Sequence, residues 1–309
     1  QDKVADVDRL PYLSHFSMGA FRVDWSDDSE WLAYEKFVPN RNSAIFLYHV
    51  KDKTIHQVTS GYYGDFSPVF DPEGKYIYFL TNRSFRSLYS DLDQTWIYPN
   101  ATQIVAASLQ DSIPSPLAAR NDEVEVKYEK KDKDKDDKGD KDKEKEKEPL
   151  KIDLDGFESR VVVLPITAGN YNYLNALKGQ VLFTKYPRSG TTNGKSSIVT
   201  YILKDREEKT IIEDVSSYRI SADRKKLLVA QRGSFGIIDP KPNQKIETKL
   251  RTSELEAVID PRAEWHQILT DVWRKYRDYF YDENMHQVDW KAVRAKYDPL
   301  VDQCLTRWD

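Results

Sequence analysis

The sequence predicts a mainly β protein: a partial β-propeller of about four blades of antiparallel sheet, followed by a short α-helical segment. Three observations predict this class. A strand–turn–strand unit recurs along the chain, and aromatic side chains suited to sheet packing are abundant, with 19 Tyr and 7 Trp among 309 residues. The hydrophobic period then changes from 2 to 3.6 at Asp260.

The recurring unit is clearest in residues 66–80. Its turn, Asp71-Pro72-Glu73-Gly74, places Pro where a turn needs a fixed φ and Gly where it needs a positive one. Residues 25–34 match it without a gap, and residues 220–229 form a weaker copy. A repeat of about 40 to 50 residues built from short strands is typical of propeller blades. Unrelated hairpins of a β-sandwich are the alternative.

Each predicted blade is a set of short strands in chain order. The first blade spans Met18–Thr59, with strands at Ala20–Trp25, Trp31–Phe37, Ala44–Val50 and Ile55–Thr59. The second starts at Tyr62, runs through Leu80 and resumes at Gln103–Leu109. A strand-like stretch at Lys151–Phe157 precedes the third blade, which is predicted at Arg160–Leu164, Gln180–Lys185, Ile198–Leu203 and Lys209–Ile212. The fourth and shortest blade spans Ser217–Ile238.

A charged tract interrupts the strands. Residues 127–148 contain 10 Lys and 10 acidic residues, so we expect a self-neutral, disordered insertion at about 122–149. The chain's net charge of −4 therefore arises outside this tract. Without a basic surplus, the composition argues against nucleic acid and against an anionic membrane surface as partners.

The remaining composition bears on the cell compartment. A single Cys, Cys304, excludes an intrachain disulfide, and no apolar run is long enough to span a membrane. Residues 1–10 lack the apolar core of a signal peptide, and the chain lacks an initiator Met. These features favour a processed or excised piece of a longer protein in the cytoplasm, with the periplasm as the alternative.

An aromatic loop at Thr81–Asn100 has two interpretations. Its aromatic residues are Phe85, Tyr89, Trp96 and Tyr98. If they project from one face of the propeller, they line a peptide-binding mouth or channel. If they fold back, they cap the sheets and exclude water, which is the commoner role of such residues.

Helices are predicted from Asp260 onwards. Asp260-Pro261 is a typical helix start, and apolar residues follow at helical spacing at Trp265, Ile268, Leu269, Val272, Trp273, Tyr276 and Phe280. A second helix is predicted at Asp289–Tyr297, and Pro299 is expected to open a third. The wide apolar face predicts a partner segment outside these helices. The predicted domains are 1–256 and 257–309.

No residue is predicted to be catalytic, cofactor-binding or metal-binding. Residues 189–196 resemble a phosphate-binding loop, but a strand rather than a helix follows, so a hairpin loop is expected. Residues 233–236 miss the spacing of a nucleophile elbow. The five histidines lack zinc-ligand spacing; they are His15, His49, His56, His266 and His286. His266 is expected on an exposed helix face, and His286 is expected to shape a turn. Asn82 and Asn100 match glycosylation acceptors, which matter only in a secretory compartment.

Several stretches resemble the tricorn protease family. In the helical part these are residues 260–265, 273–274, 277–282, 284–286 and 288–290, which resemble the opening of the family's catalytic core. Upstream, residues 66–70, 152–156 and 160–165 resemble its second, seven-bladed propeller. Gln287 departs from the family, which usually has Gly at this position of the turn.

The resemblance implies a serine peptidase that cuts oligopeptides, with the propeller as a substrate channel or filter. The family's catalytic His, Ser and Glu lie beyond the position of Asp309, so none is carried over and the chain alone is expected to be inactive. Oligopeptide substrates, the remainder of the peptidase core and a homo-oligomeric assembly are the implied partners, and no cofactor is implied. The alternative is a stand-alone β-propeller protein-interaction module.

Overall fold

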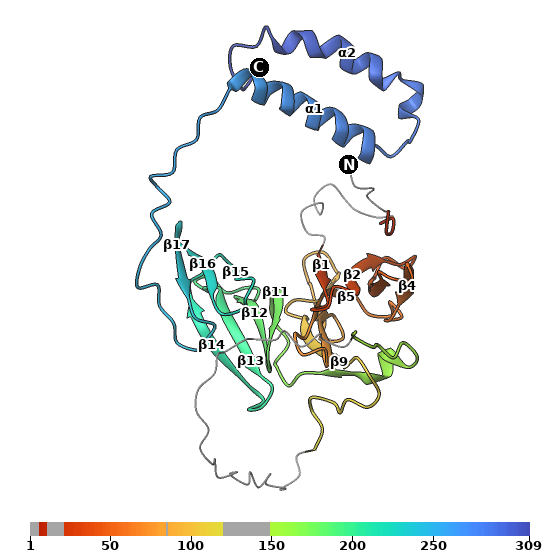
Figure 1. Ribbon diagram of the computed structural model, residues 1–309, viewed down its shortest axis with the longest axis vertical. Coiled ribbons are helices and arrows are strands. Elements are labelled where there is room, and N and C mark those ends of the chain that lie inside the picture. Colours follow the sequence, from red (N-terminus) through yellow and green to blue (C-terminus); the bar gives the residue numbers. More distant parts are fainter. Residues whose placement is uncertain (1–5, 11–21, 85, 120–148) are drawn as a thin grey trace, which may run out of the picture. The chain divides into compact units, whose positions relative to one another are not determined.

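The computed structural model describes residues 6–10, 22–84, 86–119 and 149–309. The chain forms two compact units, Gln1–Leu250 and Arg251–Asp309. The first unit is built of antiparallel sheets and the second of helices (Figure 1). This confirms the predicted class, whereas the domain division at 256/257 stays a prediction.

Four antiparallel sheets form the blades of the first unit. The first contains β1 (Val23–Trp25), β2 (Trp31–Phe37), β3 (Ser43–His49) and β4 (Thr54–Gln57). The second contains β5 (Asp65–Phe70), β6 (Tyr76–Thr81), β9 (Gln103–Ser108) and β10 (Val161–Val163). The third contains β11 (Asn170–Leu177), β12 (Gln180–Tyr186), β13 (Ser197–Ile202) and β14 (Glu207–Glu213). The fourth contains β15 (Ser217–Ile220), β16 (Leu227–Gln231) and β17 (Ser234–Ile238).

The recurring unit forms the same hairpin in three blades. Its turn places one residue in the left-handed region at equivalent positions, Ser29 (φ 62°), Gly74 (φ 68°) and Arg224 (φ 58°). An acidic side chain caps each turn; for example, Asp28 accepts the Glu30 N–H at 3.1 Å and Asp223 accepts the Lys225 N–H at 3.1 Å. The repeat read from the sequence is therefore a repeat of turn geometry as well as of strands.

The blades pack face to face, and strands in the middle of the stack contribute to two cores. Along β6, Ile77 and Phe79 pack with the first blade, while Tyr78 and Leu80 pack with the third. All four side chains are fully buried. Because side chains alternate between the faces of a strand, a continuous apolar run here means a sheet covered on both sides. A further cluster joins the third blade to the fourth.

The third blade begins later in the chain than predicted. Residues 160–164 do not start it, because Val161 and Val163 pair with Ala107 and Val105 of β9 and so complete the second blade. The inner strand of the third blade is β11, which the sequence analysis missed because its alternation is broken by a bulge between 172 and 175.

The charged tract enters between β9 and β10, inside the second blade. The predicted disordered insertion at about 122–149 lies almost wholly outside the described residues. The strand-like prediction at 151–157 is wrong. This segment is irregular and leads into a short 3₁₀ helix, η1 (Phe157–Arg160), because its apolar side chains pack onto the core between the first two blades instead of pairing in a sheet.

The helical unit contains α1 (Pro261–Tyr279), the 3₁₀ turn η2 (Met285–Gln287) and α2 (Trp290–Val301). Asp260 caps α1 as predicted, because its side chain accepts the N–H groups of Arg262 and Ala263. Two reciprocal hydrogen bonds from indole N–H groups join the helices. Trp273 donates to the Trp290 carbonyl at 2.8 Å, and Trp290 donates to the Trp273 carbonyl at 3.0 Å.

Pro299 does not open a third helix. It lies inside the last turn of α2, which continues to Val301. A proline close to a helix end removes one backbone bond but leaves little helix beyond it to disrupt. Within the described residues, neither this unit nor the propeller unit contains a helix long and apolar enough to cross a membrane.

Candidate functional site

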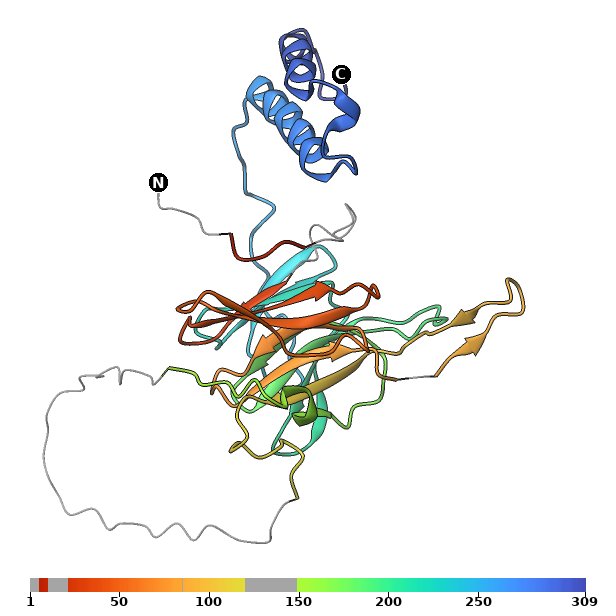
Figure 2. The same cartoon turned by 90° about the vertical axis from the view of Figure 1, so that its right-hand side faces the viewer.

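An aromatic hairpin projects from the second blade and is the strongest candidate for a functional site. The sequence predicts a loop here, but part of it pairs as β7 (Leu88–Tyr89) and β8 (Trp96–Ile97). The hairpin extends well away from the sheets in Figure 2, where it is drawn in gold. Tyr89 and Trp96 face each other across it with ring centroids 5.4 Å apart in an edge-to-face arrangement, which stabilises so short a ribbon.

The apolar side chains of this hairpin do not cap the sheets. The exposed fractions are 59% for Leu88, 52% for Tyr89, 96% for Leu92, 60% for Trp96, 46% for Ile97 and 52% for Tyr98. The capping interpretation is therefore wrong for these residues, because a residue that seals a core loses nearly all of its exposure. Exposed apolar side chains gathered in one place are typical of a binding surface.

The hairpin shares its end of the propeller with other loops. In an up-and-down blade, the second-to-third strand connection lies at the same end as the link from one blade to the next. The hairpin is such a connection, and so are residues 38–42 and 187–196. Two further exposed aromatics, Tyr62 (75%) and Tyr63 (38%), lie on the link from the first blade to the second. This end of the propeller is thus rich in exposed aromatic groups.

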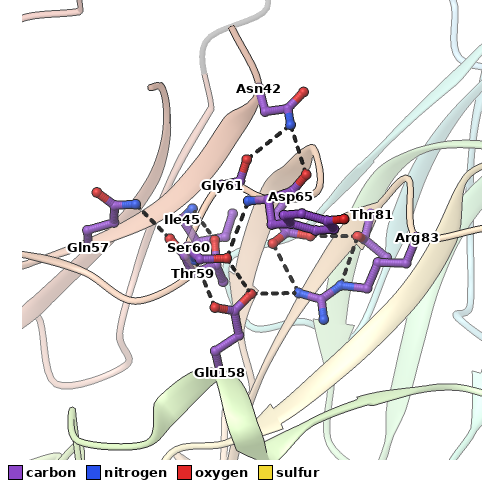
Figure 3. A network of polar contacts seen from close by, with 11 residues as sticks. Asn42, Ile45, Gln57, Thr59, Ser60, Gly61, Asp65, Thr81, Arg83 and Glu158 are labelled. Carbon is purple, nitrogen blue, oxygen red and sulfur yellow. Dashed lines mark hydrogen bonds and ion pairs between the residues drawn. The ribbon is translucent and has the colours of Figure 1, made fainter. Parts of the chain in front are cut away.

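Polar contacts fix the base of the hairpin on both sides. Arg83 lies two residues after the end of β6, and its guanidinium lies 3.1 Å from a carboxylate oxygen of Asp65 and 3.4 Å from one of Glu158 (Figure 3). On the other side, the Asn100 side chain accepts the Ser189 N–H at 2.9 Å. The hairpin is therefore held in place by its base.

Asp65 is the buried centre of this network. Its side chain is fully buried and accepts the Thr81 hydroxyl at 2.5 Å (Figure 3). Burial raises the pKa of Asp65, and the bonds from Thr81 and Arg83 oppose that rise. Glu158 accepts the Ser60 N–H at 2.9 Å, which joins the first blade to η1. The network has a structural role rather than a catalytic one. The carboxylate oxygens of Asp65 and Glu158 already accept hydrogen bonds from Thr81, Arg83 and Ser60.

A second polar cluster ties the inner strands together. Asp24 accepts the Phe70 N–H at 2.7 Å, and Glu35 accepts the Ser67 N–H at 2.6 Å, so both carboxylates bind the backbone of β5. Burial raises the pKa of Asp24 to about 6 and also raises that of Glu35. The sequence analysis missed these residues because their partners come from another blade.

The motifs that resembled catalytic loops are turns between strands. Residues 189–196 connect β12 to β13, as predicted. In residues 233–236, Gly233 (φ 76°) makes the turn between β16 and β17. Gly236 lies against the Ile246 side chain, because a Cβ at position 236 would be 2.4 Å from Ile246 Cγ2. In the part of the chain that the structure describes, no group of three or more His, Cys, Asp and Glu side chains could hold a metal ion.

Both helical-unit histidines have structural contacts. The His266 side chain is 41% exposed and lies 3.0 Å from Asp302, so it links α1 to the end of α2 from an exposed helix face. His286 shapes the turn as predicted: its N–H donates to Asp282 at 2.9 Å and its ring contacts the Tyr281 hydroxyl. Gln287 has φ 66°, a conformation that glycine adopts without strain, which explains why Gly suits this position.

Together these features define a β-propeller protein with a helical continuation and an aromatic rim at one end. Family models identify it further: the tricorn protease second beta propeller domain matches residues 14–241, and the tricorn protease C1 domain matches residues 261–309. The chain therefore belongs to the tricorn protease family.

Individual relatives and a solved structure support the same family assignment. The tricorn protease homolog of Saccharolobus solfataricus is 27% identical over 302 residues, covering 93% of this chain and 26% of that protein. The tricorn protease of Thermoplasma volcanium is 27% identical over 300 residues, covering 92% and 27%. The crystal structure of the tricorn protease shares the fold, with a TM-score of 0.70 at 21% identity over 93% of this chain and 27% of that one. The chain spans about a quarter of the length of these relatives.

Proposed function

We propose that this chain is the non-catalytic, substrate-handling part of a tricorn-like serine peptidase that degrades oligopeptides. In this proposal the propeller admits peptides to a channel and the helices join it to the peptidase core. The proteolytic class rests on family membership. The intact peptidase is further proposed to be a homo-oligomer of the cytoplasm or periplasm.

The aromatic hairpin is the observation that supports substrate handling. Tyr and Trp provide large, rigid contact surfaces that also carry a hydrogen-bonding group, so they bind peptides of varied sequence. The Arg83–Asp65 ion pair holds the base of the hairpin, which lowers the entropy that binding would cost. Exposed apolar side chains on a hairpin whose base is held in place are better suited to contacting an entering peptide than to filling a core.

The helical unit supports attachment to the core. Along α1, Ile268, Val272, Tyr276 and Tyr279 are 38% to 55% exposed and fall on one face of the helix. Neither helix contains a buried residue within the unit. In this proposal the remainder of the peptidase core covers that face.

The test uses a full-length peptidase that carries these residues. Replacing residues 86–98 by a short Gly–Ser turn should lower kcat/KM for long fluorogenic oligopeptides by about tenfold, with little effect on a small single-residue amide substrate. The matched control shortens residues 190–194, an exposed loop segment at the same end of the propeller, and keeps Ser189 with its bond to Asn100. Equal kcat/KM for long peptides with and without the hairpin would refute the proposed role.

A further inference from the structure

We propose that the outer edge of β7 binds an oligopeptide as an added antiparallel strand, with its amino end at the hairpin tip and its carboxyl end at the base. This inference rests on the proposed function and deepens it by naming a binding mode, a direction and a length. It is carried by three observations: an unpaired strand edge, exposed aromatic side chains beside it, and opposite charges at its two ends.

The hairpin is a two-stranded sheet with two free edges. Among the described residues, β7 pairs only with β8. The Ser90 N–H donates inward to the Thr95 carbonyl at 2.9 Å. Because successive residues of a strand direct their N–H groups to opposite sides, Tyr89 presents its N–H and carbonyl to the outer edge. A third strand would pair with these groups, as in other cases of strand addition, and would stabilise a ribbon that is marginal alone.

Charge selects between the two edges. Arg86 is exposed and precedes β7 at the base, while Asp91 is exposed in the turn at the tip. A peptide antiparallel to β7 runs from tip to base, so its ammonium group meets Asp91 and its carboxylate meets Arg86. A peptide antiparallel to β8 runs the other way and brings like charges together at both ends. The edge of β7 is therefore the favoured site.

The spacing of the charges sets the peptide length. Arg86 and Asp91 are five residues apart in the sequence. At roughly 3.3 Å per residue of strand, an extended segment of that length spans at most about 16 Å, which matches an extended peptide of about five residues. Such a peptide alternates its side chains between the two faces of the ribbon, where the exposed Leu88 and Tyr89 side chains provide apolar contact on either face.

The experiment measures binding of a pentapeptide of alternating valine and threonine to the 309-residue chain by isothermal titration calorimetry. The peptide is used in three forms: with free termini, N-acetylated and C-amidated. We expect each blocked form to bind about threefold to fivefold more weakly than the free peptide, the effect of one exposed ion pair. Asp91→Asn should abolish the effect of acetylation alone, and Arg86→Gln should abolish the effect of amidation alone.

A matched control and a deletion make the result decisive. Glu247→Gln, which likewise replaces a carboxylate by an amide at an exposed site, in the segment that follows the fourth blade, should leave all three affinities unchanged. Replacement of residues 86–98 should remove binding. The inference is overturned if the peptide does not bind or if acetylation and amidation have no effect. It is also overturned if Arg86→Gln abolishes the effect of acetylation and Asp91→Asn abolishes that of amidation. Should turnover by the full-length peptidase still depend on the hairpin, the proposed function would survive that result.

Discussion

Replacing Arg83 with Met tests whether the network at the base of the hairpin stabilises the fold. The substitution keeps an apolar stem but removes the cation that lies 3.1 Å from Asp65 and 3.4 Å from Glu158. The Asp65 side chain is 0% exposed and that of Arg83 is 17% exposed, so solvent screens this pair poorly. The carboxyl of Asp65 would be left buried without its charge partner.

Breaking a buried ion pair by removing one partner costs about 3–5 kcal/mol. Asp65 can limit this cost by taking up a proton, since a shift of one pKa unit is worth about 1.4 kcal/mol. We therefore expect Arg83→Met to lower the free energy of unfolding by about 2–4 kcal/mol at pH 7. For a domain of this size that corresponds to a fall of about 5–15 °C in Tm.

The loss should depend on pH in a defined direction. Burial already raises the pKa of Asp65 above its unfolded value, so its stabilising contribution falls as pH rises through the folded pKa. Arg83 opposes that rise, and without it the folded pKa of Asp65 increases further. The loss of stability in Arg83→Met should accordingly be larger at pH 8 than at pH 5.

Urea denaturation followed by tryptophan fluorescence at both pH values measures this effect. Arg188→Met is the matched control, because Arg188 is exposed, lies at the same end of the propeller and donates to one carbonyl; its effect should stay below about 0.5 kcal/mol. Adding Asp65→Asn to Arg83→Met should recover stability at pH 8. A loss under about 0.5 kcal/mol at pH 8, or a larger loss at pH 5, would refute the reasoning.

Three further predictions concern the blade junctions and the helical turn. Asp24→Asn should flatten the pH dependence of stability between about pH 4 and 6, because the folded pKa of Asp24 is raised to about 6 and its contribution falls as pH rises through that range; an unchanged slope in urea titrations would contradict this. Gly236→Ala should destabilise the fold by about 1–3 kcal/mol, since the new Cβ would lie 2.4 Å from Ile246 Cγ2, and adding Ile246→Ala should restore part of the loss. Gln287→Gly should raise the thermal midpoint of the helical signal by relieving about 1 kcal/mol of left-handed strain, whereas Val288→Gly, at φ −76°, should lower it.

The sequence by itself determined the repeated blade and the start of the helices. Both depend on residues close together in the chain: the acidic turn residue and the left-handed residue of each hairpin, and the Asp260 cap of α1. Such local geometry can be read from sequence because the partners of each group lie within a few residues of it.

Only the tertiary structure decided which strand belongs to which blade and which aromatics stay exposed. Val161–Val163 could complete one sheet or begin the next, and its pairing with β9 across the charged insertion settled the matter. Trp96 and Tyr98 are residue types that often pack in cores, yet Trp96 pairs with Tyr89 in a projecting ribbon and both Trp96 and Tyr98 stay about half exposed. Asp24 and Glu35 likewise gain their roles from β5, a strand of another blade. The blade assignment and the roles of Asp24 and Glu35 depend on contacts between residues distant in sequence, about which periodicity and local propensity carry no information. The exposure of the ribbon depends on which part of the fold, if any, packs over it, and this too is decided by the tertiary structure.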